Sequence, residues 1–275
     1  MKEFSLLMSL YEKENPKWFK ECMDSILNST VLPNQIVLVK DGLLSPELND
    51  IIDDYKSKFP NDFLLVKLPT NVGLGAALRE GVKYCDKELI ARMDADDIVE
   101  EKRFELQLNE FEYNGEIDIL GSCAQLINED SVRGGGKLVP VEHDQILKML
   151  WCCPIIHPSV MYKKSVILKA GSYSRTLKRR QDFDLWVNCA INGATFHNLN
   201  IPLIQYRLTS GTYKKNTLSV SWAQAKIGIK CARYFNSGLL AYCGAIYPLI
   251  KSLLPLPLAI QLAKLLTKVD PRNRV

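Results

Sequence analysis

Apolar residues in the first hundred positions form short runs that alternate with longer amphipathic segments. The short runs predict buried strands at 4–10, 35–39, 63–68 and 88–91. The amphipathic segments predict helices at 16–27 and 45–58, and a turn at 71–75 opens a third helix that runs to about residue 84. Asn15 can cap the first of these helices, and Pro16 occupies a first helical position, where proline is favoured. Regular alternation of strand and helix is typical of a parallel sheet with helices on both faces.

The pattern is less regular beyond residue 100. It predicts helices at 103–113, 144–150 and 181–192, and a strand that begins at 117–122. Three consecutive glycines, Gly134 to Gly136, predict a flexible turn. A proline-bounded connection at 152–158 leads into the apolar segment 159–162. No internal repeat or low-complexity tract interrupts this order.

Three carboxylates, Asp94, Asp96 and Asp97, follow the short strand at 88–91 directly. Like charges this close repel unless a cation neutralises them. Mg²⁺ and Mn²⁺ take carboxylate oxygens and often keep substrate phosphate as a further ligand. Parallel sheets bind ligands beyond the carboxyl ends of their strands, and Asp41 also follows a strand, so we expect Asp41 and Asp94 to face one crevice. The alternative is a solvated acidic loop or a helix cap, since Asp is favoured at both.

Composition narrows the classes of protein that remain. The chain has 275 residues and is 47% hydrophobic, which is enough to bury a substantial core. Its 8 cysteines are scattered without Cys-x-x-Cys spacing, and it has only 3 histidines. This argues against a zinc site or a disulfide framework and favours reduced cytoplasmic thiols. We expect no signal peptide, because the apolar run from Phe4 to Leu10 is short and Glu3 stands where positive charge is usual.

Charge is distributed unevenly along the chain. Residues 185–275 contain 11 Lys and Arg but a single acid, Asp270, so this part carries +10. The whole chain carries +4, which leaves −6 for residues 1–184. A basic C-terminal part indicates an anionic partner.

Two apolar runs lie within this basic part, from Gly238 to Ile250 and from Leu253 to Ala263. Both are shorter than the roughly 20 residues that a spanning helix needs. We expect them to lie in the interface of an anionic leaflet. A helical hairpin packed on the rest of the protein is the alternative. No nucleic-acid-binding motif accompanies the charge, so we do not expect nucleic acid as a partner.

Six short motifs occur in an order and spacing that together identify a resemblance. They are Ser9–Tyr11, Val37–Gly42, Asn71–Arg79, Met93–Asp97, His157–Met161 and Arg180–Trp186. Over residues 1 to about 210 the chain resembles a family-two glycosyltransferase of the GT-A fold. More narrowly, it is similar to bacterial O-antigen transferases that add glucose or galactose to a GlcNAc- or GalNAc-diphosphate-lipid.

The resemblance implies an α/β fold of GT-A type, a Rossmann-like, mostly parallel sheet flanked by helices, with a membrane-associating helical extension. It implies a catalytic domain at 1–210, with a nucleotide-sugar half at about 1–115 and an acceptor half at about 116–210, followed by the extension at 211–275. The implied donor is UDP-glucose or UDP-galactose, and the acceptor is GlcNAc- or GalNAc-diphosphate-undecaprenol. The implied cofactor is Mn²⁺ or Mg²⁺, and the implied location is the cytoplasmic face of the bacterial inner membrane.

The resemblance also implies roles for single residues. Asp96 would bind the metal, Asp94 would lie between the metal and the ribose, and Asp97 would either support them or cap a helix. The nucleotide-sugar contacts would be made by Ser9, Asp41, Asn71, Arg79, Asp94 and Arg207. Asp41 in Asp-Gly is equally typical of a turn, and Arg79 of a helix surface.

The general base would be Asp182, in a position where the family has a Glu-Asp pair and this chain has Gln181–Asp182. A single base with no opposing nucleophile implies direct displacement with inversion. Stabilisation of a helix N-terminus is the structural alternative for Asp182. His157 and Trp186 are candidate acceptor contacts, with burial in the core as the alternative for each.

Two other classes of protein remain open at this point. A nucleotidyltransferase could use the same kind of metal–diphosphate site without Asp182. A non-catalytic subunit could bind the sugar nucleotide alone, although intact Asp94, Asp96 and Asp182 argue against this.

Overall fold

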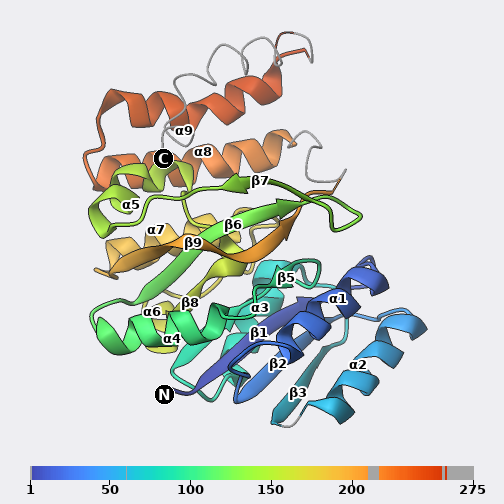
Figure 1. Cartoon of the computed structure of the whole chain (residues 1–275). Coiled ribbons are helices and arrows are strands. Elements are labelled where there is room, and N and C mark those ends of the chain that lie inside the picture. Colours follow the sequence, from blue (N-terminus) through green and yellow to red (C-terminus); the bar gives the residue numbers. More distant parts are fainter. Residues whose placement is uncertain (1, 60, 210–216, 256–257, 259–275) are drawn as a thin grey trace.

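The computed structural model describes residues 2–59, 61–209, 217–255 and 258, and its centre is a nine-stranded sheet (Figure 1). The strands are β1 (Phe4–Leu10), β2 (Gln35–Asp41), β3 (Asp62–Leu68), β4 (Leu89–Arg92), β5 (Ile98–Val99), β6 (Ile119–Ile127), β7 (Arg133–Lys137), β8 (Met161–Lys163) and β9 (Phe196–Arg207). The helices are α1 (Pro16–Leu27), α2 (Pro46–Lys58), α3 (Leu74–Tyr84), α4 (Arg103–Tyr113), α5 (His143–Met149), α6 (Lys164–Lys169), α7 (Gln181–Ile191), α8 (Leu218–Tyr234) and α9 (Gly238–Leu253). Two short 3₁₀ turns are η1 (Leu150–Cys152) and η2 (His157–Ser159).

Strands β3, β2, β1 and β4 form the parallel part of the sheet. In this register Leu7 of β1 lies beside Arg92 of β4, and Ser9 lies beside Val39 of β2. The carboxyl ends of these strands therefore meet at one edge, which is where parallel sheets bind ligands. Asp41 ends β2 at this edge, and the loop that carries Asp94 leaves β4 there.

The other part of the sheet is mixed. β8 pairs antiparallel with both β4 and β6, while β6 pairs in parallel with β9. The short strand β5 follows the acidic loop and pairs antiparallel with the end of β9. The last strand of the sheet is thus brought against the loop that leaves β4.

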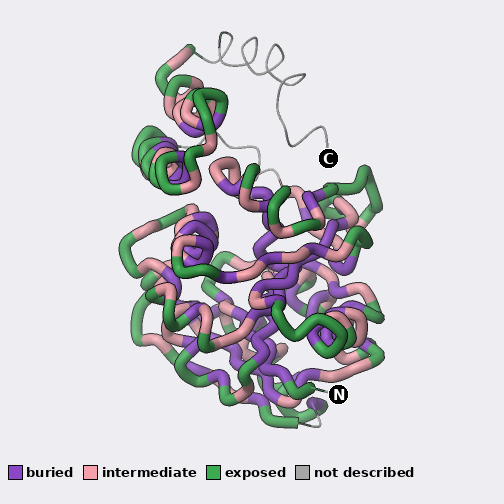
Figure 2. Tube along the Cα trace, turned by 90° about the vertical axis from the view of Figure 1, so that its left-hand side faces the viewer, coloured by how far each residue is buried: buried purple, intermediate pink, exposed green. Residues whose placement is uncertain are grey.

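The sheet is covered by helices on both faces, and Figure 2 shows burial concentrated along its strands. In β1, Leu6 and Met8 pack in the cluster that includes α1, α2 and α4. Leu7 points to the opposite face and packs in the cluster that includes α3 and α7. Both faces of the parallel strands are buried, which explains their continuous apolar sequence.

Helices α8 and α9 pack against each other and against η1. A Cβ at Gly228 would lie 2.7 Å from the Cβ of Ala245, and one at Gly244 would lie 2.1 Å from the ring of Trp151. Glycine therefore permits this close approach. A hydrogen bond also joins α8 to α7, because Nζ of Lys230 donates to Oδ1 of Asn188 at 2.6 Å. Within the described residues, no helix has both the length and the apolarity that a membrane crossing needs.

Some expectations from the sequence are contradicted by the structure or lie outside the described residues. The prediction of a flexible turn at Gly134–Gly136 is wrong, because these residues belong to the exposed strand β7, which pairs with β6. β7 is exposed along its whole length and pairs with β6, so it is held by backbone hydrogen bonds and not by side-chain packing. Glycine can form these backbone hydrogen bonds although it has no side chain. The apolar run Leu253–Ala263 lies largely outside the described residues, as does the expected domain boundary at 210.

Candidate active site

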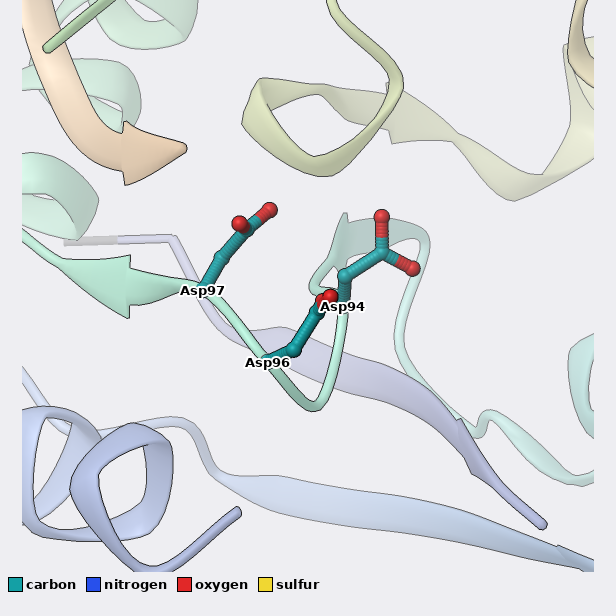
Figure 3. A group of neighbouring side chains, drawn as sticks. All are labelled: Asp94, Asp96 and Asp97. Atoms are coloured by element: carbon teal, nitrogen blue, oxygen red, sulfur yellow. The ribbon is translucent and has the colours of Figure 1, made fainter. Parts of the chain in front are cut away.

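The loop between β4 and β5 holds a compact acidic cluster. One carboxylate oxygen from each of Asp94, Asp96 and Asp97 lies within 4.8 Å of the others, and Figure 3 shows all three side chains rising from the same side of the loop. Burial and the charge of Asp94 raise the pKa of Asp96 to about 6. Burial and the two neighbouring carboxylates raise the pKa of Asp97 well above its usual value. These shifts indicate a site whose negative charge is compensated only in part.

The donor set fits a hard divalent cation. Oxygen ligands from three carboxylates suit Mg²⁺ or Mn²⁺. Oδ2 of Asp97 is buried and has no hydrogen-bond partner among the described residues. A cation bound between Asp94, Asp96 and Asp97 would relieve both the repulsion and this unpaired oxygen.

Arg92, the last residue of β4, contacts the acidic cluster from the protein interior. Its Nη2 forms an ion pair with Oδ1 of Asp94, although the Arg92 side chain is only 1% exposed. Burial acts to lower the pKa of Arg92, but the Asp94 carboxylate, together with the nearby Tyr173 and Asp97, raises it overall. Nε and Nη1 of Arg92 are buried and unpaired within the described part of the chain. Arg92 is therefore a permanent cation directed at one carboxylate of the cluster.

Arg207, at the end of β9, braces the same loop from another side. Its backbone N–H donates to Oδ1 of Asp97 at 2.7 Å, and its Nε donates to the carbonyl oxygen of Asp96 at 2.7 Å. Nη2 donates to Oε2 of Glu21 at 2.7 Å, and the guanidinium lies over the ring of Trp18. These contacts occupy the Arg207 side chain with protein partners. A direct contact with the nucleotide stays a prediction.

Asp41 organises the turn that precedes α3. Oδ1 accepts from the backbone N–H of Val72 at 2.7 Å, and Oδ2 accepts from that of Gly73 at 3.0 Å. Nδ2 of Asn71 donates to the carbonyl oxygen of Asp41 at 3.3 Å. The carboxylate therefore performs the turn function that its sequence suggests. Each carboxylate oxygen retains a lone pair that could accept a further hydrogen bond. Recognition of a uracil N–H by Asp41 stays a prediction.

Arg79 and Ser9 lie on elements that lead to this edge. Nη1 of Arg79 donates to the carbonyl oxygens of Gly171 and Tyr173, at 2.5 and 3.0 Å. Arg79 thereby fixes the segment that follows α6. Ser9 is half-buried near the carboxyl end of β1. Roles for Arg79 and Ser9 in binding the nucleotide stay predictions.

Asp182 lies in the first turn of α7 and is half-buried. A Cβ at Gly75 would lie 3.0 Å from the Cβ of Gln181, so the start of α7 packs against the start of α3. The turn before α3 is held by Asp41 at the carboxyl edge of the sheet. The structure thus places Asp182 on a helix that begins near this edge, and its role as the base stays a prediction.

His157 and Trp186 belong to the core behind this region. Nε2 of His157 shares a 3.0 Å hydrogen bond with the hydroxyl of Tyr173, and its ring centroid lies 5.9 Å from that of Trp186. Burial and the charge of Arg92 lower the pKa of His157 well below its usual value. The Trp186 side chain is fully buried. Their candidate roles in acceptor binding stay predictions.

Glu14 is a further acid near the cluster that the sequence pattern does not single out. Burial, Asp96 and Asp94 raise the pKa of Glu14 to about 8. Burial, Glu14 and Asp96 likewise raise the pKa of Tyr11. Glu14 and Tyr11 lie in the loop after β1. The sequence does indicate Glu14 and Tyr11 in one respect, because both follow the carboxyl end of a predicted parallel strand.

Comparison with known proteins agrees with this geometry. Residues 5–168 match the family described as glycosyl transferase family 2. An uncharacterized glycosyltransferase of Haemophilus influenzae is 35% identical over 231 residues, covering 82% of this chain and 85% of the relative. The UDP-Gal:alpha-D-GlcNAc-diphosphoundecaprenol beta-1,3-galactosyltransferase of Escherichia coli is 33% identical over 216 residues, covering 78% and 77%.

Solved structures show the same fold at much lower identity. The crystal structure of S. aureus TarS 1-349 in complex with UDP-GlcNAc has a TM-score of 0.68 and 16% identity, and the match covers 91% of this chain and 71% of that TarS 1-349 chain. The mostly parallel sheet flanked by helices is therefore a GT-A fold. The family match, the relatives and the acidic site agree, and the chain is a glycosyltransferase that belongs to glycosyl transferase family 2.

Proposed function

We propose that this enzyme transfers glucose or galactose from a UDP-sugar to a HexNAc that is linked through a diphosphate to undecaprenol, in O-antigen or surface polysaccharide synthesis. A β-1,3 linkage is proposed by analogy with the E. coli relative, whose name states that linkage. The observation that carries the proposal is the three-carboxylate cluster at the carboxyl ends of the parallel strands. Such a cluster suits a metal–diphosphate pair, because it gathers oxygen ligands that a hard divalent cation prefers.

The proposed mechanism is direct displacement with inversion. A Mn²⁺ or Mg²⁺ ion at Asp94 and Asp96 would stabilise the charge that develops on the leaving diphosphate. Asp182 accepts the proton of the acceptor hydroxyl as its oxygen bonds to the anomeric carbon. The bond from that carbon to the diphosphate breaks, and UDP leaves with the bonding electrons. The product of an α-linked donor is a β-glycoside.

The remaining residues orient the donor. Ser9, Asp41 and Asn71 surround the edge of the sheet at β1 and β2, where the nucleoside is proposed to bind. Arg79 and Arg207 act on the same region, in part by holding the segment after α6 and the acidic loop. His157 and Trp186 are proposed to shape the acceptor side from within the core. The catalytic domain is proposed to span residues 1–210 and the extension 211–275.

We further propose that the extension contacts an anionic leaflet, at the cytoplasmic face of the inner membrane. A surface groove of about 680 Å³ between α7 and α8 is lined by three cations, Lys226, Lys230 and Arg233. A few residues along the chain from Arg233, at the start of α9, Leu239 and Leu240 are 78% and 79% exposed. Cations next to exposed leucines are typical of a peripheral membrane surface. A lipid-linked acceptor would make such a contact useful.

A transfer assay tests the proposal. The purified chain is incubated with a synthetic GlcNAc- or GalNAc-diphosphate-lipid, a panel of UDP-sugars and Mn²⁺ or Mg²⁺, with and without EDTA. We expect metal-dependent transfer from UDP-glucose or UDP-galactose. In a second assay the chain is given UTP and a sugar phosphate. Formation of UDP-sugar and pyrophosphate would instead support a nucleotidyltransferase. Binding of UDP without transfer to any acceptor would support a sugar-nucleotide-binding subunit.

A further inference from the structure

The segment between α6 and α7 carries a dense group of cations. Arg175, Lys178, Arg179 and Arg180 lie within six residues, immediately before the proposed base Asp182. Among the described residues, none of these four forms a salt bridge, and Arg175, Lys178 and Arg179 are exposed. We call Arg175, Lys178 and Arg179 the cationic loop. Their positive charge is available to an external anion.

The base of the cationic loop is fixed to α3. Nη1 of Arg79 donates to the carbonyl oxygens of Gly171 and Tyr173. Gly75 lies so close to the loop that a Cβ there would be 2.6 Å from the carbonyl oxygen of Ser174. The loop therefore starts from a defined position, and α7 resumes regular structure directly after it.

The cationic loop also lies at the carboxyl edge of the parallel strands. A Cβ at Gly75 would lie 3.0 Å from the Cβ of Gln181, so the residues on both sides of the loop pack against the start of α3. The turn before α3 is held at this edge, because the backbone N–H groups of Val72 and Gly73 donate to the carboxylate of Asp41. The cations therefore lie at the edge of the sheet that carries Asp41, next to the helix that carries the proposed base. An acceptor that presents its hydroxyl to Asp182 would bring its own diphosphate into this region.

Charge complementarity favours such a contact. The donor diphosphate is neutralised by the metal at the acidic cluster, but the acceptor carries a second diphosphate. The surrounding carboxylates of Asp94 and Asp96 would repel this second group. Arginine binds phosphate oxygens with two parallel hydrogen bonds, and lysine adds a compact positive charge. We propose that Arg175, Lys178 and Arg179 bind the diphosphate of the lipid-linked acceptor.

The proposal rests on the proposed function, since it presumes a diphosphate-linked acceptor. It predicts a selective effect in the triple variant Arg175→Gln/Lys178→Gln/Arg179→Gln. We expect the KM for HexNAc-diphosphate-lipid to rise by about 10- to 100-fold, because exposed ion pairs contribute modestly and three are lost. The KM for the UDP-sugar and the slow metal-dependent hydrolysis of the donor by water should remain unchanged. Added KCl should raise the acceptor KM of the parent protein but hardly affect the variant.

A HexNAc acceptor with a neutral alkyl chain is the matched substrate. Its turnover should be the same in the parent and in the triple variant. Lys56→Gln/Lys67→Gln/Lys102→Gln, which removes three exposed cations elsewhere, is the matched protein control and should resemble the parent. Equal loss on both acceptors, or an unchanged acceptor KM, would overturn the proposal.

Direct binding separates this inference from the proposed function. Inorganic pyrophosphate is titrated into protein already saturated with UDP and Mn²⁺, and its affinity is measured by calorimetry. We expect binding that weakens about 10-fold in the triple variant and not in the lysine control. This result would support the cationic loop even if no tested sugar were transferred. Pyrophosphate binding that is equal in all three proteins would refute it, whatever the outcome of the transfer assay.

Discussion

The guanidinium of Arg92 forms an ion pair with the carboxylate of Asp94 from inside the protein, where Arg92 is only 1% exposed. A buried arginine needs a charged partner, because desolvation of an unpaired cation costs several kcal/mol. The ion pair thereby holds the Asp94 carboxylate in one orientation. Its second oxygen, Oδ2, is proposed to face a ligand of the acidic cluster.

Loss of this cation should weaken metal binding. Arg92→Met leaves Asp94 without its partner, so we expect Mn²⁺ affinity in the presence of UDP to fall by at least about 10-fold, together with turnover. Arg92→Lys retains the charge and should recover part of both. Calorimetric titration of Mn²⁺ measures the affinity. Equal Mn²⁺ affinity in parent and Arg92→Met would contradict the assigned role.

Asp96→Asn should abolish metal-dependent transfer, with a loss of about 100-fold or more. The physical reason is the removal of the charged oxygen that is proposed to bind the cation. The residual activity should no longer respond to EDTA. Asp53→Asn, an exposed position on α2, is the control and should behave as the parent. The idea fails if Asp96→Asn retains EDTA-sensitive turnover.

The metal-free protein should lose stability as pH rises. Burial and neighbouring charge raise the pKa of Asp96 to about 6 and that of Glu14 to about 8. The folded state therefore holds protons that the unfolded state releases, so unfolding becomes easier as pH rises through each folded pKa. We expect Tm, measured in EDTA, to decline between about pH 5 and pH 9.

Mn²⁺ with UDP should reverse much of this decline, because the cation replaces the lost protons. Glu14→Gln should flatten the part of the decline between about pH 6 and pH 8, where folded Asp96 has lost its proton but folded Glu14 has not. A Tm that rises steadily over this range in EDTA would show that other groups dominate.

Asp182→Asn should lower kcat for transfer by about 100-fold or more, while the affinity for UDP stays the same. The amide cannot accept the proton of the acceptor hydroxyl. Asp184→Asn, two residues along α7, is the matched control and should retain most activity. Oδ2 of Asp184 accepts a hydrogen bond from Nδ2 of Asn188 on the same helix. Unchanged turnover in Asp182→Asn would exclude Asp182 as the base.

Gly244→Ala should loosen the extension. The added Cβ would lie 2.1 Å from the ring of Trp151, so the ring or α9 must move, at a cost of about 1–3 kcal/mol. We expect a lower Tm and faster proteolysis of α9, with UDP affinity retained. Gly115→Ala, where a Cβ meets no atom within 4 Å, is the control. Equal Tm values in both variants would show that the contact with Trp151 contributes little.

Much of the parallel part of the sheet follows from sequence pattern. The strand at 4–10 and the helix at 16–27 have the predicted limits, because two-sided burial and a proline at the helix start leave clear signals. The pattern does not predict β9, whose residues mix Asn, His and Pro with apolar side chains. That strand is specified by its neighbours β6 and β5 more than by its own periodicity.

Some residues of the candidate site can be predicted from the sequence and others cannot. Asp94, Asp96 and Asp97 stand out because three acids follow a strand. Arg92 cannot be assigned from sequence, because a cation in an apolar strand shows its partner only once the strand is placed. The internal contacts of Arg79 are equally invisible, since Gly171 and Tyr173 are brought to it by the fold.

The hydrogen bond from Arg207 to Asp97 joins residues 110 positions apart in the chain. During synthesis, the acidic loop therefore exists long before its brace has been made. Until β9 docks, the loop lacks β5's partner strand, and its repelling carboxylates are held only by contacts within the first part of the chain. The active site is in this sense a late product of folding, and a chain stopped short of β9 would contain every acidic residue of the cluster without the means to assemble them.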